Sequence, residues 1–324
     1  MTIEQYNRKV SLLVGANSGD ALDLSAFRIR FTIRRGDYQN PNICEIRVFN
    51  LTENTVSRIQ GEFSRVILQG GYEGNFGILF DGTIIDRCVG RENNTDTYLD
   101  LVVSDGDRAY NYAMMAVSLA AGSTPEDGVQ AILQQMGRSG VSRGYIPELP
   151  QNKSLRGEVF YGQASQCMRE IANNLEMTWS IQDGKLTMIP LTAYVPGEVP
   201  VISPETGLIG MPTQTPNGIE MRVLLNPSIK IGQLIRLEHA TVQLHQYDTS
   251  FQAQAKNIAT AKQNRLNQAG LYYVMIADSV GDTRGQEWYS DLVCLAVDAT
   301  VAPKAEILNQ VKVNPVIAPI KRNG

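Results

Sequence analysis

The stretch Phe27-Arg28-Ile29-Arg30-Phe31-Thr32-Ile33-Arg34 alternates apolar and polar residues without a break. Successive side chains of a β-strand point to opposite faces, so this pattern predicts a strand with one face in a core. Residues 44–48 repeat the alternation, and a short helix is expected over 51–63 with Thr52 as its N-cap. Further strands are expected at 65–69, 78–89 and 97–103. Several short strands interrupted by one small helix predict a barrel or sandwich.

The middle third of the chain changes to a helical period. Residues 124–137 begin with Thr-Pro and carry apolar residues three and four apart, which predicts a capped amphipathic helix. A second helix is expected over 164–175. It is followed by a hairpin over 179–188 whose turn is Asp183-Gly184. These elements predict a small α+β module.

The last third returns to strand patterns after a connector that is expected to be extended over 196–216, where Pro, Gly, Ser and Thr are frequent. Strands are expected at 219–225, 233–238, 240–247, 271–277 and 287–297. The segment Gly281–Gly285 is expected to form the tip of the hairpin between the last two strands. The segment Pro303–Gly324 holds three prolines and reads as an arm or tail.

The expected fold is therefore mainly β (α+β). We expect a first β-barrel domain over residues 1–110, an α+β insert over 111–195, a second β-barrel domain over 196–302, and an extended C-terminal arm over 303–324. No repeat is detectable at the level of residues, but the two β-regions are similar in size. One chain is thus expected to carry two related barrels with an insertion between them.

Composition excludes several classes of protein. The chain has 324 residues, 43% hydrophobic and 19% charged, which is enough apolar material for a core and argues against wholesale disorder. A net charge of −4 does not fit a polybasic nucleic-acid binder. The four cysteines form no Cys-x-x-Cys pair, and each is expected to be a small core residue. No signal peptide or membrane-length apolar stretch is present, so a soluble protein made in the cytosol is expected.

Catalytic and metal-binding patterns are weak. The only histidines, His239 and His245, lack an evident third ligand, so structural roles are favoured over a metal site. Two acid pairs come nearest to a catalytic arrangement, Asp81 with Asp86 and Asp105 with Asp107. Both pairs sit beside glycines in expected turns, where Asp commonly makes local hydrogen bonds. No catalytic residue, cofactor site or metal site is therefore predicted.

Three arginines, Arg28, Arg30 and Arg34, share the polar face of the first quoted strand. Pairing with acids such as Glu45 on the neighbouring strand is the simpler interpretation. The alternative is that a symmetric oligomer turns this face into the lining of a channel or into a subunit interface.

Three longer stretches together resemble the central baseplate hub proteins of tailed bacteriophages, chiefly the contractile-tailed ones. They are Phe80-Asp81-Gly82-Thr83-Ile84-Ile85; residues 205–215 (ETGLIGMPTQT) with Leu224-Leu225-Asn226-Pro227; and residues 270–274 (GLYYV) with residues 281–289 (GDTRGQEWY). The resemblance spans about residues 25–300. It implies two barrels related to tail-tube proteins around an inserted domain.

The resemblance also implies a function and partners. Three copies are expected to form a ring that joins the sixfold tail tube to the threefold spike, around a channel for DNA and the tape-measure protein. The DNA is expected to pass without specific binding. Some relatives carry a lysozyme or a fused spike, and 324 residues leave no room for either, so a separate spike protein is expected. The implied location is the tail baseplate of the virion, assembled in the host cytoplasm, with no enzymatic activity and no cofactor.

The expected contacts with neighbouring chains are the arginine face, the hairpin tip and the C-terminal arm. They comprise Arg28, Arg30, Arg34, Asp282, Thr283, Arg284, Pro303, Pro315 and Pro319. Two other functions stay open: the core hub of a phage-derived contractile injection or secretion machine, and a tail-associated enzyme that degrades cell wall.

Overall fold

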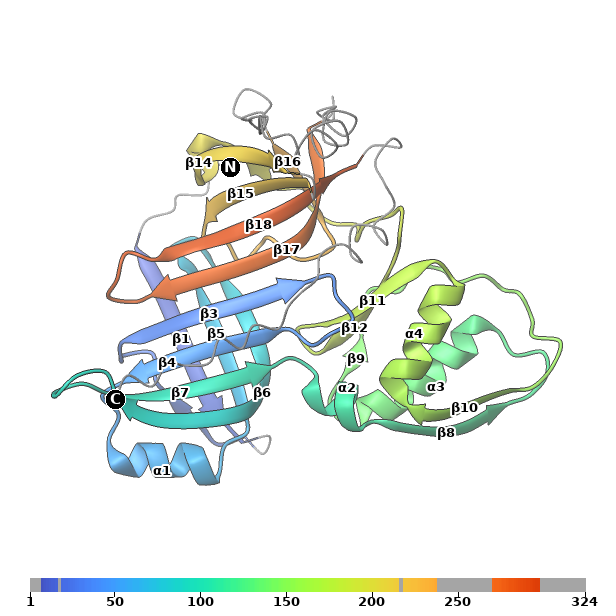
Figure 1. Cartoon of the computed structure of the whole chain (residues 1–324), viewed down its shortest axis with the longest axis horizontal. Coiled ribbons are helices and arrows are strands. Elements are labelled where there is room, and N and C mark those ends of the chain that lie inside the picture. The colour runs from blue at the N-terminus through green and yellow to red at the C-terminus, as the bar shows by residue number, and fades with distance from the viewer. Residues whose placement is uncertain (1–6, 17–18, 216–217, 238–269, 298–324) are drawn as a thin grey trace, which may run out of the picture.

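The computed structural model describes residues 7–16, 19–215, 218–237 and 270–297. It is mainly antiparallel β-structure, as expected. Thirteen strands form one long sheet, and two smaller sheets of two and three strands belong to a separate part that contains most of the helices. This part lies beside the long sheet (Figure 1).

The first β-region confirms the expected strands and helix. Its elements are β1 (Arg8–Gly15), β2 (Ala21–Asp23), β3 (Ile29–Gly36), β4 (Ile43–Phe49), α1 (Glu53–Gly61), β5 (Arg65–Tyr72), β6 (Asn75–Arg91) and β7 (Thr97–Ser104). The Thr52 hydroxyl caps α1 by accepting a hydrogen bond from the Thr55 N–H at 3.3 Å. β1 and β2 are additions to the expected set. The strands curl around a core that includes Phe31, Ile46, Leu68, Phe80 and Leu101.

The insert confirms both expected helices and the hairpin. Its elements are α2 (Asp107–Tyr112), β8 (Met114–Leu119), α3 (Pro125–Gly137), β9 (Ser142–Arg143), β10 (Glu158–Gln163), α4 (Ala164–Asn174), β11 (Met177–Gln182) and β12 (Lys185–Pro190). Thr124 and Asp127 form a capping box at the start of α3. β8 and β10 form a two-stranded ribbon that the sequence does not predict. Trp179, which is fully buried, lies in the core of this part.

The second β-region differs from expectation at its start. Its elements are β13 (Val201–Ile202), the 3₁₀ turn η1 (Pro204–Thr206), β14 (Leu208–Thr215), β15 (Gly218–Leu224), β16 (Leu234–Leu237), β17 (Leu271–Asp282) and β18 (Trp288–Ala296). Residues 201–215 are therefore largely strand, not an extended connector. Pairing with β15 overrides the weak strand propensity of the Gly, Pro and Thr in β14. The strand expected at 240–247 lies outside the described residues.

The two β-regions repeat one strand order. We number β1, β3, β4, β5, β6 and β7 as the first to sixth strands of one region, and β13 to β18 as those of the other. In both, the sheet order is first, fourth, fifth, sixth, third and second. Two differences are that β1 pairs antiparallel with β5 whereas β13 pairs parallel with β16, and that β2, which pairs with β1, has no described counterpart. The barrels are thus duplicates in topology, while domain boundaries at residues 110, 195 and 302 stay predictions.

The strand registers also reveal a repeat at the level of residues, which corrects the expectation that there is none. β4 contains Glu45-x-Arg47-Val48, and its counterpart β15 contains Glu220-x-Arg222-Val223. β7 contains Tyr98-x-Asp100-Leu101-Val102, and β18 contains Tyr289-x-Asp291-Leu292-Val293. The match is invisible along the chain because it covers two short strands separated by connections of different length and by the insert.

A β-bulge falls at the same place in both regions. Ile85 is the extra residue of β6, between the pairs Ile84–Val103 and Asp86–Val102. Met275 is the extra residue of β17, where Val274 faces Cys294 and Ile276 faces Val293. Counting from these bulges, Cys88 opposite Asp100 corresponds to Asp278 opposite Asp291. The registers therefore give a residue-by-residue correspondence between the two barrels.

The barrels are joined head to tail through one strand pair. The second half of β17 pairs with β3, from Ile276 opposite Gly36 to Asp282 opposite Arg30. This junction places the fifth strand of one barrel against the second strand of the other. The result is a continuous front sheet in the order β14-β15-β18-β17-β3-β4-β7-β6, with β1 and β5 behind it (Figure 1).

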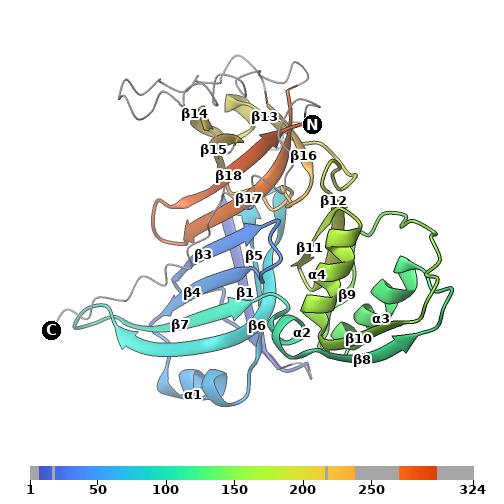
Figure 2. The same cartoon turned by 45° about the vertical axis from the view of Figure 1, so that its right-hand side comes forward.

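Buried polar contacts hold the insert against this junction. Arg35 of β3 and Lys230 of the loop before β16 both form ion pairs with Asp183 at the tip of the β11–β12 hairpin. Asp105, which is 1% exposed, accepts a hydrogen bond from the Gly184 N–H at 2.8 Å. The hairpin tip thus contacts both barrels at once, and the turned view shows the insert against the end of the sheet (Figure 2).

Candidate subunit interface and sheet face

The structure brings five of the predicted contact residues together within one chain: Arg28, Arg30, Asp282, Thr283 and Arg284. Asp282, 3% exposed, accepts a hydrogen bond from Arg28 at 2.8 Å, and Arg30 lies 3.5 Å from the same oxygen. The Thr283 hydroxyl accepts from the Ile29 N–H at 3.0 Å, and the Thr283 N–H donates to the Ile29 carbonyl at 3.0 Å. The β17–β18 hairpin tip is therefore docked on β3 of its own chain.

The negative charge of Asp282 is stabilised by the same contacts that dock the hairpin. Burial alone would raise its pKa, but hydrogen bonds from Arg28 and the Arg284 N–H, together with the charges of Arg28 and Arg30, lower the pKa to about 2. The Arg28 guanidinium also stacks on Phe49, with 4.6 Å from Cζ to the ring centre. These arginines are thus occupied in joining the barrels, and a contact with another chain stays a prediction for them.

The other predicted contact residues are less constrained. Arg34 points from the exposed face of β3 and lies 3.9 Å from Glu45 on β4, which is the simpler pairing expected from the sequence. Both side chains are more than half exposed, so this ion pair contributes little to stability. Pro303, Pro315 and Pro319 lie outside the described residues.

A repeated trio of residues on the exposed face of the front sheet was not expected from the sequence. Arg47 of β4 forms a two-pronged ion pair with Asp100 of β7 at 2.7 and 2.8 Å, and its guanidinium stacks on Tyr98 at 3.8 Å. In the other barrel, Arg222 pairs with Asp291 at 2.6 and 2.9 Å and stacks on Tyr289 at 4.0 Å.

Hydrogen bonding to the facing aspartate is the main cause that raises the pKa of Arg47 and of Arg222. The signal that could have revealed the trios is the paired occurrence of Glu-x-Arg-Val and Tyr-x-Asp-Leu-Val in both β-regions.

The two ends of the front sheet are edges without a partner among the described strands. β5 pairs with β6 only as far as Thr83, and no other described strand pairs with the same edge of β6 beyond that point. β14, at the opposite end, pairs with β15 alone among the described strands. Each edge carries exposed apolar side chains: Ile85 and Val89 on β6, and Ile209 and Met211 on β14. Long apolar edges of this kind favour pairing with another chain.

In the second barrel the corresponding half of β17 is covered by a neighbouring strand. Met275, the counterpart of Ile85, is fully buried, whereas Ile85 is 46% exposed. The half of β17 that corresponds to the free half of β6 is the half that pairs with β3. Cys88 on the free half is exposed, which corrects the expectation that every cysteine is a core residue; Cys44, Cys167 and Cys294 are buried.

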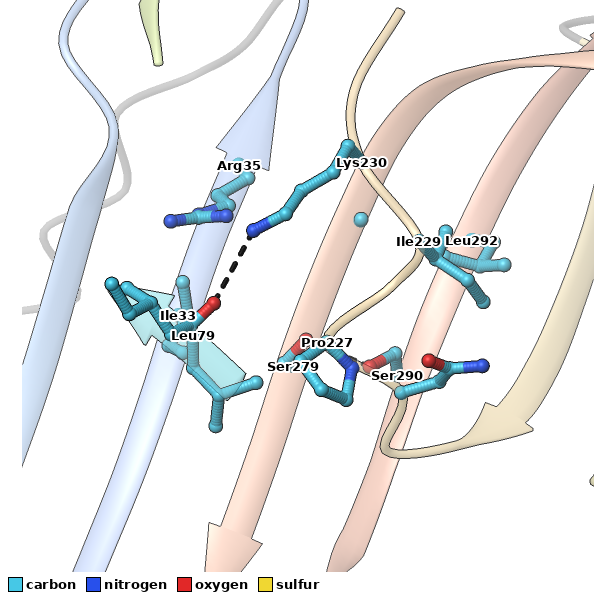
Figure 3. A pocket seen from close by; sticks show the side chains of 12 residues that line it. Ile33, Arg35, Leu79, Pro227, Ile229, Lys230, Ser279, Ser290 and Leu292 are labelled. Carbon is cyan, nitrogen blue, oxygen red and sulfur yellow. Dashed lines mark hydrogen bonds between the residues drawn. The ribbon is translucent and has the colours of Figure 1, made fainter. Parts of the chain in front are cut away.

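The described residues contain little that favours chemistry. One cavity, of about 20 Å³, lies between the barrels, with Lys230 donating to the Ile78 carbonyl across it (Figure 3). It has room for about one water molecule. Asp81 accepts two hydrogen bonds from Arg65 at 2.9 and 2.7 Å, and the buried Asp105 accepts one from the Gly184 N–H. One carboxylate of each acid pair considered from the sequence is therefore occupied by a structural partner.

Two further features are absent from the described part of the chain. It holds no cluster of three or more His, Cys, Asp or Glu side chains arranged for a metal ion, and both histidines lie outside it. Within the same part, no helix has the length and apolar character needed to cross a membrane.

No protein-family model and no curated protein matches the sequence. Solved structures do match. The 43 kDa tail protein of prophage MuSo2 from Shewanella oneidensis has a TM-score of 0.57 at 7% identity, covering 92% of this chain and 99% of that one. A tail protein from Neisseria meningitidis MC58 has a TM-score of 0.55 at 10% identity, covering 89% and 96%.

This chain has the fold of phage tail proteins. A third match is the c3393 protein of Escherichia coli, a type VI secretion system component with structural similarity to the T4 bacteriophage tail proteins gp27 and gp5. Its TM-score is 0.51 at 7% identity, with 92% of this chain and 78% of that one covered. At such low identity the likeness concerns the fold, and the tail-protein fold confirms the two-barrel architecture with its insert.

Proposed function

We propose that this protein is a structural hub of a phage tail baseplate, in which three copies form a ring of six barrels. The head-to-tail junction between its own barrels carries the proposal. A contact that joins unlike surfaces leaves one of each free, and repeating it between copies extends the assembly until it closes. Among the described strands, the surfaces left without a partner are the second half of β6 and the edge of β14.

The junction inside the chain sets the register expected between copies. Asp278 lies opposite Arg34 in the junction. Cys88 corresponds to Asp278 through its place opposite Asp100. Position 215 corresponds to Arg34, because Thr215 faces Gly218 four residues before Arg222, and Arg34 faces Ile43 four residues before Arg47. The proposed ring therefore sets Cys88 opposite Thr215 of the neighbouring copy.

A disulfide tests this register directly. We expect Thr215→Cys to form an intermolecular disulfide with Cys88 under mild oxidation, because facing positions of paired strands come within bonding range. Denaturing gels without reductant should then show covalent dimers and trimers of the 35.7 kDa chain. Thr215→Cys combined with Cys88→Ser is the matched control and should remain monomeric on the gel. The pair Arg34→Cys with Asp278→Cys should form the equivalent bond within one chain, and absence of any link to Cys88 in the presence of that bond would contradict the proposed ring.

The remaining features of the proposed function follow from the tail-protein fold and from the resemblance in the sequence. The ring would join a sixfold tail tube or distal tube protein to a separate threefold spike protein, around a channel for the tape-measure protein and DNA. The proposed role is non-enzymatic and the proposed location is the virion tail, after assembly in the host cytoplasm. Turnover of purified cell wall that depends on Asp81 or Asp105 would instead favour the tail-enzyme alternative.

The match to a type VI secretion component supports a second candidate, the core hub of a phage-derived injection machine. Both candidates use the same ring and differ in the machinery around it. Capsid and terminase genes beside this gene would favour the phage tail, and their absence beside secretion genes would favour the injection machine.

A further inference from the structure

The exposed face of the front sheet is charged but balanced within itself. On the six strands from β15 to β7, carboxylates are at least as numerous as arginines among the outward side chains. The arginines are Arg30, Arg34, Arg47 and Arg222, and the carboxylates are Glu45, Asp100, Glu220, Asp278 and Asp291. The two trios lie at corresponding places in the two barrels, so a ring of six barrels would repeat this arrangement six times.

Each trio fixes its guanidinium flat against the sheet. The aspartate takes two N–H groups, and the tyrosine ring covers one face of the plane. The edge formed by Nε and one Nη is then no longer available for a two-pronged contact with a phosphate, and the positive charge is cancelled at short range. Arg47 is 30% exposed and Arg222 is 46% exposed, so only these partners separate them from a passing anion.

The bulk of the molecule shows which side of the sheet would face inward. β1 and β5 lie behind the front sheet in both views, and the exposed face has no described element in front of it (Figures 1 and 2). A sheet that closes into a ring has more room on its outer circumference than on its inner one. The side with the barrel cores therefore belongs outside, and the exposed face belongs inside.

We propose that this face lines the central channel and that Asp100 and Asp291 neutralise Arg47 and Arg222 so that a polyanion passes without being held. The inference rests on the proposed ring. The polyanion considered is duplex nucleic acid, which binds proteins mainly through phosphate contacts with free Lys and Arg. Loss of the aspartates would convert the lining from a neutral surface into a binding surface.

The test uses the ring cross-linked through Thr215→Cys, with and without Asp100→Asn and Asp291→Asn. Asparagine keeps the size of the side chain and removes its charge. We expect the parent ring to bind a fluorescent 30-base-pair DNA no better than background. The double variant should bind at least about tenfold more tightly at low salt, with a log–log salt slope of up to about −5 if all six freed arginines contact phosphate.

A matched variant separates this effect from a simple change of net charge. Asp81→Asn frees Arg65 on the barrel side of the molecule, where it should not reach the channel, so we expect no gain in DNA binding from it. Adding Arg47→Gln and Arg222→Gln to the double variant should abolish the binding. Equal binding by the Asp81 variant, or no gain in a ring that does form, overturns the inference while leaving the hub intact. Failure to form the cross-linked ring overturns the hub, and this inference with it.

Discussion

Arg47 and Arg222 occupy corresponding positions in the two barrels, and each pairs with an aspartate that lies far away along the chain. Alternation in the sequence places Arg47 and Arg222 on solvent faces, but it says nothing about which acid lies opposite each of them. The partners, Asp100 and Asp291, come from strands that are 53 and 69 residues away along the chain. Only the register of the sheet brings each pair together, and the register is set by the hydrophobic faces and bulges.

A prediction at this scale concerns Asp105, which sequence reasoning placed in an ordinary turn. Burial raises its pKa to about 7, against the hydrogen bond from Gly184 and the charge of Arg35, while the charge of Asp183 adds to the rise. Between about pH 4 and pH 7 the native state therefore holds a proton that the unfolded chain has lost. The free energy of unfolding should fall across this window by up to about 1.4 kcal/mol per pH unit, and then level off.

Asp105→Asn should remove this part of the pH dependence, because the amide stays neutral at every pH and can still accept from Gly184. Urea unfolding at pH 5 and pH 8 would measure this change. The free energy of unfolding of the variant, minus that of wild type, should be larger at pH 8 than at pH 5. Identical pH dependence for Asp105→Asn and wild type would mean that the buried carboxyl does not titrate in this window.

Elements with a strong period were predictable, and elements that depend on a partner were not. The strand around Phe31, helix α3 and the β11–β12 hairpin all have local signals that agree with their tertiary role. β14 lacks such a signal, since its Gly210 and Pro212 fit poorly in a strand, and it forms by pairing with β15 across a bulge. The hairpin tip was predicted as a turn. Its docking on β3 depends on contacts between residues far apart in the sequence, such as Thr283 and Ile29, which are 254 residues apart.

The docking of this hairpin yields a prediction at the scale of elements. Thr283→Ala removes the hydroxyl that accepts from the buried Ile29 N–H, and leaves that donor without the partner it has now. We expect the variant to lose about 1–2 kcal/mol in the free energy of unfolding. Thermal or urea unfolding measures the loss, and Thr283→Ser should recover most of it because the hydroxyl returns. Full stability of the alanine variant would show that the hydroxyl adds nothing to the docking beyond the backbone pairing and the ion pairs of Asp282.

At the scale of the whole molecule, duplication accounts for why two edges of one sheet have no partner among the described strands. The second half of β17 is covered by pairing with β3, and the same contact between copies would cover the corresponding half of β6, which begins at the exposed Ile85. A lysine on an edge strand discourages pairing because its charge would have to be desolvated. Ile85→Lys is therefore expected to block ring closure without disturbing the barrel, since the side chain it replaces is 46% exposed.

Sedimentation would measure this outcome. Wild type should have a mass of about 107 kDa, three times the 35.7 kDa of one chain, and Ile85→Lys should sediment as a monomer with unchanged thermal stability. Phe76 offers a matched control, because it is 43% exposed and lies on the half of β6 that β5 already covers. Phe76→Lys adds the same charge to the same strand and should leave the trimer intact. The free half of β6 is the assembly edge only if the two variants differ, and a trimer that survives Ile85→Lys would assign ring closure to another surface.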